Sequence, residues 1–180
     1  MERDALWTQE EAWPRTIFLP DDVDQKNEIT SHMSMKPRWY GGVYFGFLIP
    51  YVPKEMLWTE LILSRDGKSF ERTHQPFLPN GGAGAWDRGQ AWAAPDWVEV
   101  GDEWWITYHG SDRGPNVAVP KDTTWGIGLA KIRKEGFVSL STPDVGGVVV
   151  TRLLKWPGGD LLVNCAAPKS EMRVRISNRG

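Results

Sequence analysis

Short apolar runs separated by Gly, Pro, Asn and Asp recur along most of the chain. This pattern is typical of strands joined by turns. The strands that it predicts cover residues 29–35, 42–49, 58–64, 70–73, 90–98, 103–109, 126–133, 137–141, 148–154, 161–164 and 171–176. A helical turn is expected only over residues 7–13, where Thr8 is a suitable N-cap. The chain is therefore predicted to be all-β.

Two stretches of the chain repeat the same order of strands and turns. Residues 39–42 turn into one apolar run, and residues 98–102 turn into another. A basic–acidic–Gly turn follows in each stretch, at residues 65–67 and 134–136, and an aromatic residue starts the next strand. The acidic–Gly pair suits a tight hairpin, because Gly adopts positive φ at little cost. Two units of four antiparallel strands are typical of β-propeller blades.

The pattern changes after residue 141. Residues 142–147 form a turn-rich junction, and the three expected strands that follow indicate an incomplete β-sandwich. The predicted organisation is an N-terminal remnant or linker (1–28), two propeller blades (29–141) and a short sandwich-like segment (142–180).

Composition limits the partners of this chain. Its 180 residues carry a net charge of −2 with scattered Lys and Arg, which argues against nucleic acid. No apolar run approaches a membrane span, and the N-terminus lacks a signal-peptide pattern, so the expected location is cytoplasmic. The one cysteine and the spacing of the other ligand types imply no firm cofactor, and a structural or catalytic divalent metal stays open. The 11 Trp residues are expected either in the core or as stacking platforms for a flat ligand.

Part of the sequence is similar to a known family. The chain resembles the C-terminal part of a large group of bacterial glycosidase-like proteins in the passages ELILSRDGKSFER, WDRGQAW, GDEWWITYHGSD and GIGLAKIRKEGFVSLSTPDVGGVVVTRLLKWPGGDLLVN. Those proteins have a five-bladed β-propeller, related to the invertase and arabinanase families, followed by a β-sandwich. The resemblance covers residues 17–176 and implies a partial propeller of two four-stranded blades, then a sandwich-like segment. It also implies a carbohydrate-related function.

The resemblance singles out three candidate catalytic residues. Asp87 precedes an expected innermost strand and matches the position where such propellers point a polar group into the central funnel. Glu28 and His32 occupy the equivalent region of the previous unit. Carboxylates and a His in a funnel are suited to acid–base chemistry on a glycosidic bond. The alternatives are that Asp87 caps a turn and that His32 is a hydrogen-bonded structural residue.

Candidate substrate-binding residues lie near Asp87 and at the end of a later strand. Trp86 and Arg88 flank Asp87, and Trp105 lies next to Trp104, so in a strand the two indoles point to opposite faces. His109 and Asp112 lie where a strand enters the long loop of residues 110–124. They are interpreted either as ligand-binding groups or as a hydrogen-bonded turn.

Two blades alone leave open edges and apolar faces, so we expect a homo-oligomer. A trimer that closes a six-bladed ring is favoured, and a dimer comes next. Three functions remain open from the sequence. The first is a glycoside-hydrolase-like fragment that binds carbohydrate and hydrolyses it at a funnel completed by oligomerisation. The second is a non-catalytic ligand-binding or assembly module. The third is a promiscuous hydrolase of small activated esters or phosphoesters in an oligomer cavity.

Overall fold

A computed structural model describes residues 19–33, 36–53, 56–115, 121–142, 145–168 and 170–177. The chain divides into two compact units, Met1–Val138 and Ser139–Gly180. The expected helical turn over residues 7–13 lies outside the described residues. Within the described residues the prediction of an all-β chain is confirmed, with two antiparallel sheets and one short helix. None of the helical residues described forms a segment long and apolar enough to cross a membrane.

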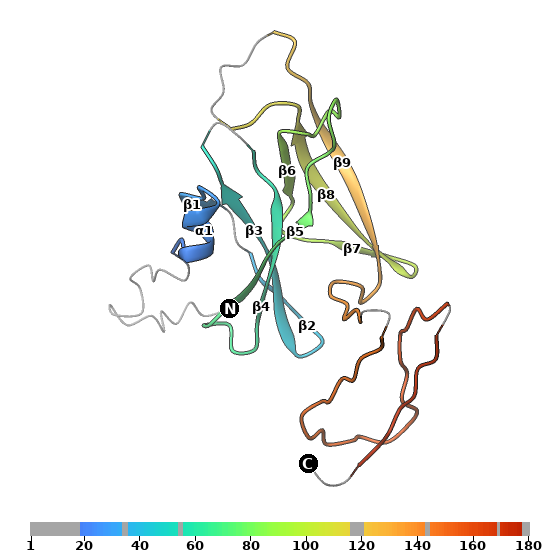
Figure 1. The fold of residues 1–180 in the computed structure, drawn as a ribbon. Coiled ribbons are helices and arrows are strands. Elements are labelled where there is room, and N and C mark those ends of the chain that lie inside the picture. The colour runs from blue at the N-terminus through green and yellow to red at the C-terminus, as the bar shows by residue number, and fades with distance from the viewer. Residues whose placement is uncertain are drawn as a thin grey trace, which may run out of the picture. The chain divides into compact units, whose positions relative to one another are not determined.

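The first sheet has a broken first strand followed by three continuous strands. β1 and β2 pair with successive parts of β3, which pairs with β4, and β4 pairs with β5, all antiparallel (Figure 1). The strands are β1 (Ser31–Met33), β2 (Arg38–Tyr40), β3 (Val43–Tyr51), β4 (Thr59–Ser64) and β5 (Glu71–Leu78).

The second sheet repeats this arrangement. β6 and β7 pair end to end with one edge of β8, and β9 pairs with β8 over its whole length. The strands are β6 (Gln90–Ala93), β7 (Val98–Val100), β8 (Glu103–Ser111) and β9 (Trp125–Arg133). Each sheet therefore begins with a divided strand and continues through a hairpin, as the sequence repeat indicates.

Several expected boundaries differ from the structure. The strand expected over residues 90–98 is divided into β6 and β7, because Pro95 between them has no N–H for a ladder bond. The expected strand at 137–141 is absent, so the described part of the second unit of the repeat has no fourth strand. The helix α1 (Asp22–Lys26) was not expected, although Asp21 before it is a favourable N-cap.

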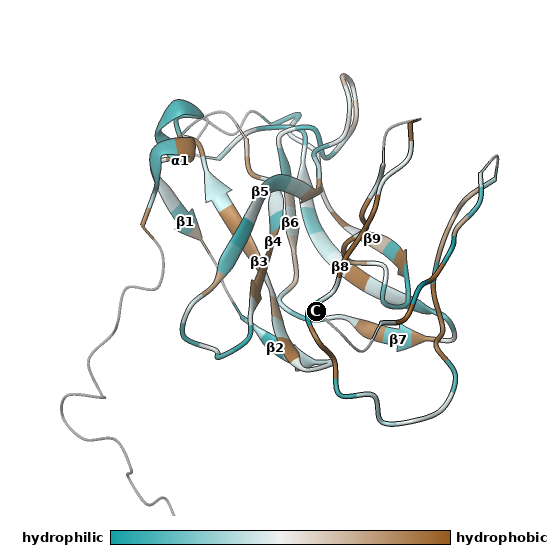
Figure 2. Cartoon of the chain, turned by 60° about the horizontal axis from the view of Figure 1, so that its bottom comes forward, coloured by the Kyte–Doolittle hydropathy of each residue, from teal (hydrophilic) through white to brown (hydrophobic). Residues whose placement is uncertain are grey.

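The C-terminal strands were predicted wrongly. Among the described residues between 139 and 177 none belongs to a strand, and many apolar side chains are exposed there (Figure 2). Val148 and Leu162 are 89% and 90% exposed. An apolar pattern favours strands but does not supply the partner whose backbone groups complete the ladder. The assignment of residues 142–180 to a sandwich-like segment stays a prediction.

The turn between β4 and β5 follows the expected chemistry. Asp66 Oδ1 accepts hydrogen bonds from the backbone N–H of Lys68 and of Ser69, both at 2.8 Å. Gly67 adopts a φ of 70°, which a side chain at this position would disfavour. These bonds confirm the interpretation of Asp66 as a structural turn residue.

The hydrophobic core lies between the two sheets. It contains apolar side chains from β3 and β4 on one side, and from β8 and the segments flanking the second sheet on the other: Phe47, Leu61, Ala93, Trp97, Trp104, Ile106 and Phe137. Trp104 is fully buried, with its ring centroid 4.4 Å from that of Phe137. Trp105 lies on the opposite face of β8 and is half-buried, as expected for adjacent strand residues.

A backbone seam also joins the sheets. The N–H of Leu57 donates to the carbonyl of Gly89 at 3.1 Å, and the N–H of Ala91 donates to the carbonyl of Leu57 at 2.9 Å. Thr59 Oγ1, on the neighbouring strand β4, donates to the carbonyl of Ala91 at 2.9 Å. The seam holds the start of β4 against β6, so residues near position 58 have a fixed place in the fold.

Candidate functional site

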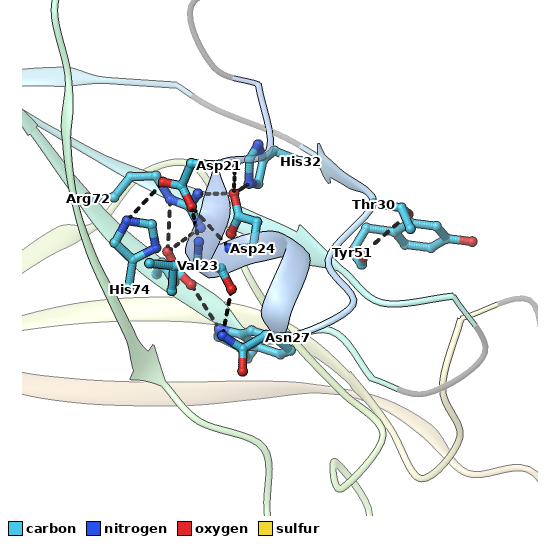
Figure 3. Close-up of polar contacts among 11 residues, drawn as sticks. Asp21, Val23, Asp24, Asn27, Thr30, His32, Tyr51, Arg72 and His74 are labelled. Atoms are coloured by element: carbon cyan, nitrogen blue, oxygen red, sulfur yellow. Dashed lines mark hydrogen bonds and ion pairs between the residues drawn. The ribbon is translucent and has the colours of Figure 1, made fainter.

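A buried cluster of charged side chains lies where α1 meets the first sheet (Figure 3). Helix α1 is anchored by a capping box, in which Asp21 Oδ1 accepts from the N–H of Val23 and of Asp24. In return Asp24 Oδ2 accepts from the N–H of Asp21 at 3.1 Å. This reciprocal pair satisfies N–H groups that a helix start otherwise leaves open. It also fixes the side chain of Asp24 within the cluster.

Two carboxylates in the cluster share one guanidinium. Arg72 donates from Nη1 to Asp24 Oδ2, and from Nε and Nη2 to Glu60 Oε2 at 3.1 and 2.9 Å. His32 Nε2 lies 3.0 Å from Asp24 Oδ2. The side chains of Asp24, Glu60, Arg72 and His32 are 0%, 2%, 4% and 6% exposed. The network is therefore almost closed to water, which strengthens each charge interaction within it.

The environment shifts the ionisation of three of these groups. Burial would raise the pKa of Asp24, but hydrogen bonds from Arg72 and from the N–H of Asp21 outweigh it, so the pKa is lowered. Burial and the charge of Arg72 lower the pKa of His32 against the opposing effect of Asp24, which favours the neutral imidazole. Burial opposes the charge of Arg72, yet its two carboxylate partners raise its pKa further.

A cavity of about 300 Å³ lies beside this cluster, and we call it the Trp58 cavity. Its lining combines an indole, a carboxylate and an imidazole with apolar side chains: Val23, Asn27, Ile29, Val52, Met56, Trp58, Glu60, His74 and Pro76. Trp58 Nε1 donates to Glu60 Oε1 at 3.3 Å, which fixes the edge of the indole. The cavity therefore offers both an aromatic surface and hydrogen-bonding groups.

His74 enters this region from an irregular part of β5. The register between β4 and β5 shifts between Glu60 and Ile62, and His74 has a φ of 51°. A β-bulge with a positive φ redirects a side chain that a regular strand would place elsewhere. His74 Nε2 lies 3.2 Å from Asp21 Oδ2, so the imidazole contacts the helix cap as well as the cavity.

The predicted catalytic residue Asp87 lies in a second group, on the other sheet. Tyr108 Oη donates to Asp87 Oδ2 at 2.8 Å, and Trp86 stacks on Tyr108 with ring centroids 5.7 Å apart. Trp86 lies directly over Gly110, where any side chain would collide with the indole. Burial and the Asp87 carboxylate raise the pKa of Tyr108 to about 12. Asp87 is thus half-buried and tied to a protonated phenol.

The predicted binding residues have mixed surroundings. Arg88 Nε donates to the carbonyl of Asp112 at 3.0 Å, and Asp112 Oδ1 accepts from the N–H of Thr124 at 3.1 Å. These bonds close the ends of the long loop, in line with the alternative of a hydrogen-bonded turn. His109 packs against Trp125 with ring centroids 5.2 Å apart.

The remaining two predicted residues lie away from any shared pocket. Lys131 Nζ covers the ring of Trp105 at 4.1 Å from its centroid, so one face of this indole is occupied. Glu28 is exposed after the end of α1 and has a φ of 58°. The structure therefore joins Trp86 with Asp87 and places His32 in the cluster around Asp24, on the first sheet.

Sequence reasoning missed most of the cluster. The notable omissions are Asp21, Asp24, Trp58, Glu60, Arg72 and His74. A local signal existed for the helix cap, since Asp21 and Asp24 have the spacing of a capping box. A second signal is Trp58 two residues before Glu60, which places both on one face of a strand. The sequence holds no local signal for the pairing of Arg72, because its partners come from distant segments.

Comparisons with known proteins give one match. No family model matches the sequence, and no curated protein matches it. Among solved structures the chain is similar to one that is described as a complex of BT0996 and RGII, with 15% sequence identity and a TM-score of 0.44. The similarity covers 56% of this chain and 32% of the other, so this chain spans about a third of that protein's length.

Proposed function

We propose that the chain is a carbohydrate-binding protein that holds one neutral sugar residue in the Trp58 cavity. The observation that supports it is the lining of the cavity, where an indole, a carboxylate and an imidazole surround a volume of about 300 Å³. This volume lies at the small end of ligand pockets, which run from roughly 300 to 1,000 Å³. It suits one ring of an oligosaccharide rather than a larger ligand.

The chemistry of the lining matches the two surfaces of a sugar. The C–H face of a pyranose or furanose packs on an aromatic ring such as that of Trp58, while its hydroxyl groups donate to carboxylate oxygens. Glu60 is held in place by Arg72 and Trp58, so a hydroxyl that binds to it meets a fixed acceptor. Asp21 and Asp24 add negative charge nearby, which disfavours uronic acids and favours neutral sugars.

Binding without turnover fits this cavity better than hydrolysis. A glycosidase needs a carboxylic acid that keeps its proton near neutral pH. The pKa of Asp24 is shifted in the opposite direction, and the carboxylate of Glu60 is engaged by Arg72. Both groups therefore serve as hydrogen-bond acceptors.

Glycoside hydrolysis is the second candidate, and the Asp87–Tyr108 pair favours it. Asp87 immediately precedes the start of β6, where the resembled propellers present a polar group to their funnel, and it is half-buried beside Trp86. In this candidate the funnel is completed by oligomerisation. Release of nitrophenol from aryl glycosides, abolished by Asp87→Asn with the fold intact, would support this candidate over binding alone.

Isothermal titration calorimetry with purified neutral gluco-, xylo-, manno- and arabino-oligosaccharides tests the main proposal. At least one should bind, and Trp58→Ala should weaken binding by about tenfold or more, the loss expected for an aromatic anchor. Trp39→Ala is the matched control, because Trp39 is 55% exposed on β2 and packs on Tyr44 away from the cavity. Equal losses in both variants, or binding only of uronic-acid oligosaccharides, would contradict the proposal.

A further inference from the structure

Three potential metal ligands converge where α1 meets β5. One carboxylate oxygen from each of Asp21 and Asp24 and one ring nitrogen of His74 all lie within 4.8 Å of one another. We propose that this triad binds a divalent first-row transition ion such as Zn²⁺. Carboxylate oxygens and imidazole nitrogens are both ligands of Zn²⁺, whereas Mg²⁺ prefers oxygen ligands alone. This inference concerns the triad itself and does not depend on the binding of carbohydrate.

A buried carboxylate oxygen supports the metal site independently. Asp24 Oδ2 already accepts from Arg72 and from the N–H of Asp21. Asp24 Oδ1 is buried and has no hydrogen-bond partner within the described part of the chain. Nearly all buried polar atoms of native proteins are paired, because a bare one retains the full cost of desolvation. Oδ1 is thus the oxygen left for a ligand, and a metal ion would satisfy it.

The charge of the cluster also favours a cation. Asp21, Asp24 and Glu60 provide three carboxylates, and Arg72 is the cation that contacts two of them. His32 is favoured in its neutral form by the lowering of its pKa. This leaves two uncompensated negative charges next to a side chain that is completely buried, and buried charges are normally paired or bound to metal. A divalent ion would balance them.

The geometry gives the ion a route and an open coordination position. The side chains of His74 and Asp21 are 28% and 48% exposed, so an ion can reach the triad from solvent. Three protein ligands leave the fourth position of a tetrahedral ion for water. His74 belongs to the triad and also lines the Trp58 cavity, so this position is expected to lie near the cavity.

The test uses the full chain, stripped of metal with a chelator and then titrated with ZnCl₂ or MgCl₂ in a calorimeter. We expect one Zn²⁺ per chain with a micromolar or lower Kd and at least about 100-fold weaker binding of Mg²⁺. Asp21→Asn and His74→Asn should each weaken Zn²⁺ binding by about tenfold or more. Asn is itself a good N-cap, so Asp21→Asn preserves the helix start. Asp22→Asn removes the same charge from the same helical turn and should leave the affinity within about twofold.

Two results would overturn the inference. The first is the absence of saturable Zn²⁺ binding up to about 1 mM, a range in which even weak protein sites fill. The second is Zn²⁺ binding that His74→Asn leaves unchanged, above all if Cys165→Ser removes it, because Cys165 is an exposed free thiol. Imidazole NMR signals of the unmodified protein decide the matter even if a variant misfolds. Those of His74 should shift on addition of Zn²⁺, and a shift of His109 alone would contradict the site.

Discussion

The buried network around Arg72 predicts a large and specific loss of stability on its removal. Arg72→Met keeps most of the side-chain volume but leaves Asp24 and Glu60 without the guanidinium that both contact. Breaking a buried ion pair by removing one partner costs about 3–5 kcal/mol. Because two carboxylates lose the same partner, we expect the upper part of this range, about 4–5 kcal/mol. A folded domain has only about 5–15 kcal/mol in total, so the variant should be close to unfolding.

Urea denaturation followed by tryptophan fluorescence measures this loss. With a urea dependence of about 2 kcal/mol per M, the unfolding midpoint should fall by roughly 2 M. The control is Lys134→Met, which removes a cation from an exposed pair with Glu99 at 2.7 Å and should cost at most about 1 kcal/mol. A loss below about 1 kcal/mol in Arg72→Met, equal to the control, would refute a buried network at this position.

Acid should reduce the difference between the two proteins. The pKa of Asp24 in the folded protein is lowered from 3.8, so its contribution to stability is complete above that value and is lost as the pH falls through the folded pKa. Arg72→Met removes the cause of the lowering and leaves burial, which raises the pKa. The difference in stability between the two proteins should therefore shrink below about pH 4. A difference that stays constant down to about pH 2.5 would contradict this linkage.

Three further predictions concern the second sheet and the loop before it. Gly89→Ala should destabilise the protein by about 3 kcal/mol in urea denaturation, because the added Cβ would collide with the backbone of Arg113; Gly82→Ala, where the Cβ meets nothing within 4 Å, should stay within about 0.5 kcal/mol, and equal effects would contradict the packing. Ultraviolet titration should show one tyrosine ionising near pH 12, and Asp87→Asn should move it toward 10; the stability that this pair contributes is present below pH 10 and lost between about 10 and 12, and an unmoved tyrosine would exclude the hydrogen bond. Light scattering should give a multiple of 20.4 kDa, because Val98, Trp125, Ile127 and Leu129 are exposed on one face of the second sheet, and Ile127→Lys should lower that mass; a monomer at all concentrations would refute the predicted homo-oligomer.

The sheets could be predicted from the sequence because their signals are local. β4, β8 and β9 follow apolar runs bounded by Gly turns, and the repeat located both hairpins of the sheets within a few residues. Pro95, which divides β6 from β7, is equally visible in the sequence. The C-terminal strands were predicted wrongly because the same apolar pattern occurs where no partner strand completes a ladder within the described residues.

The candidate site could not be predicted in the same way. Its central contact joins Asp24 in a helix, Glu60 in β4 and Arg72 in β5, and it depends on a register shift between the two strands. A change of register by one residue would move each side chain to the opposite face of the sheet. His32 was identified as a candidate because of its residue type, but the carboxylate that contacts it was not. Such sites require the fold before the chemistry becomes visible.

Fluorine NMR of the full chain labelled with 5-fluorotryptophan tests the central claim most directly, since each of the 11 Trp residues reports on its own surroundings. Trp58→Phe and Trp39→Phe assign the two signals that matter. On titration with the neutral oligosaccharide that binds most tightly, the Trp58 signal should shift saturably and the Trp39 signal should not move. Saturable shifts of Trp39, Trp86 or Trp125 with an unchanged Trp58 signal would show that carbohydrate binds elsewhere and would contradict the account.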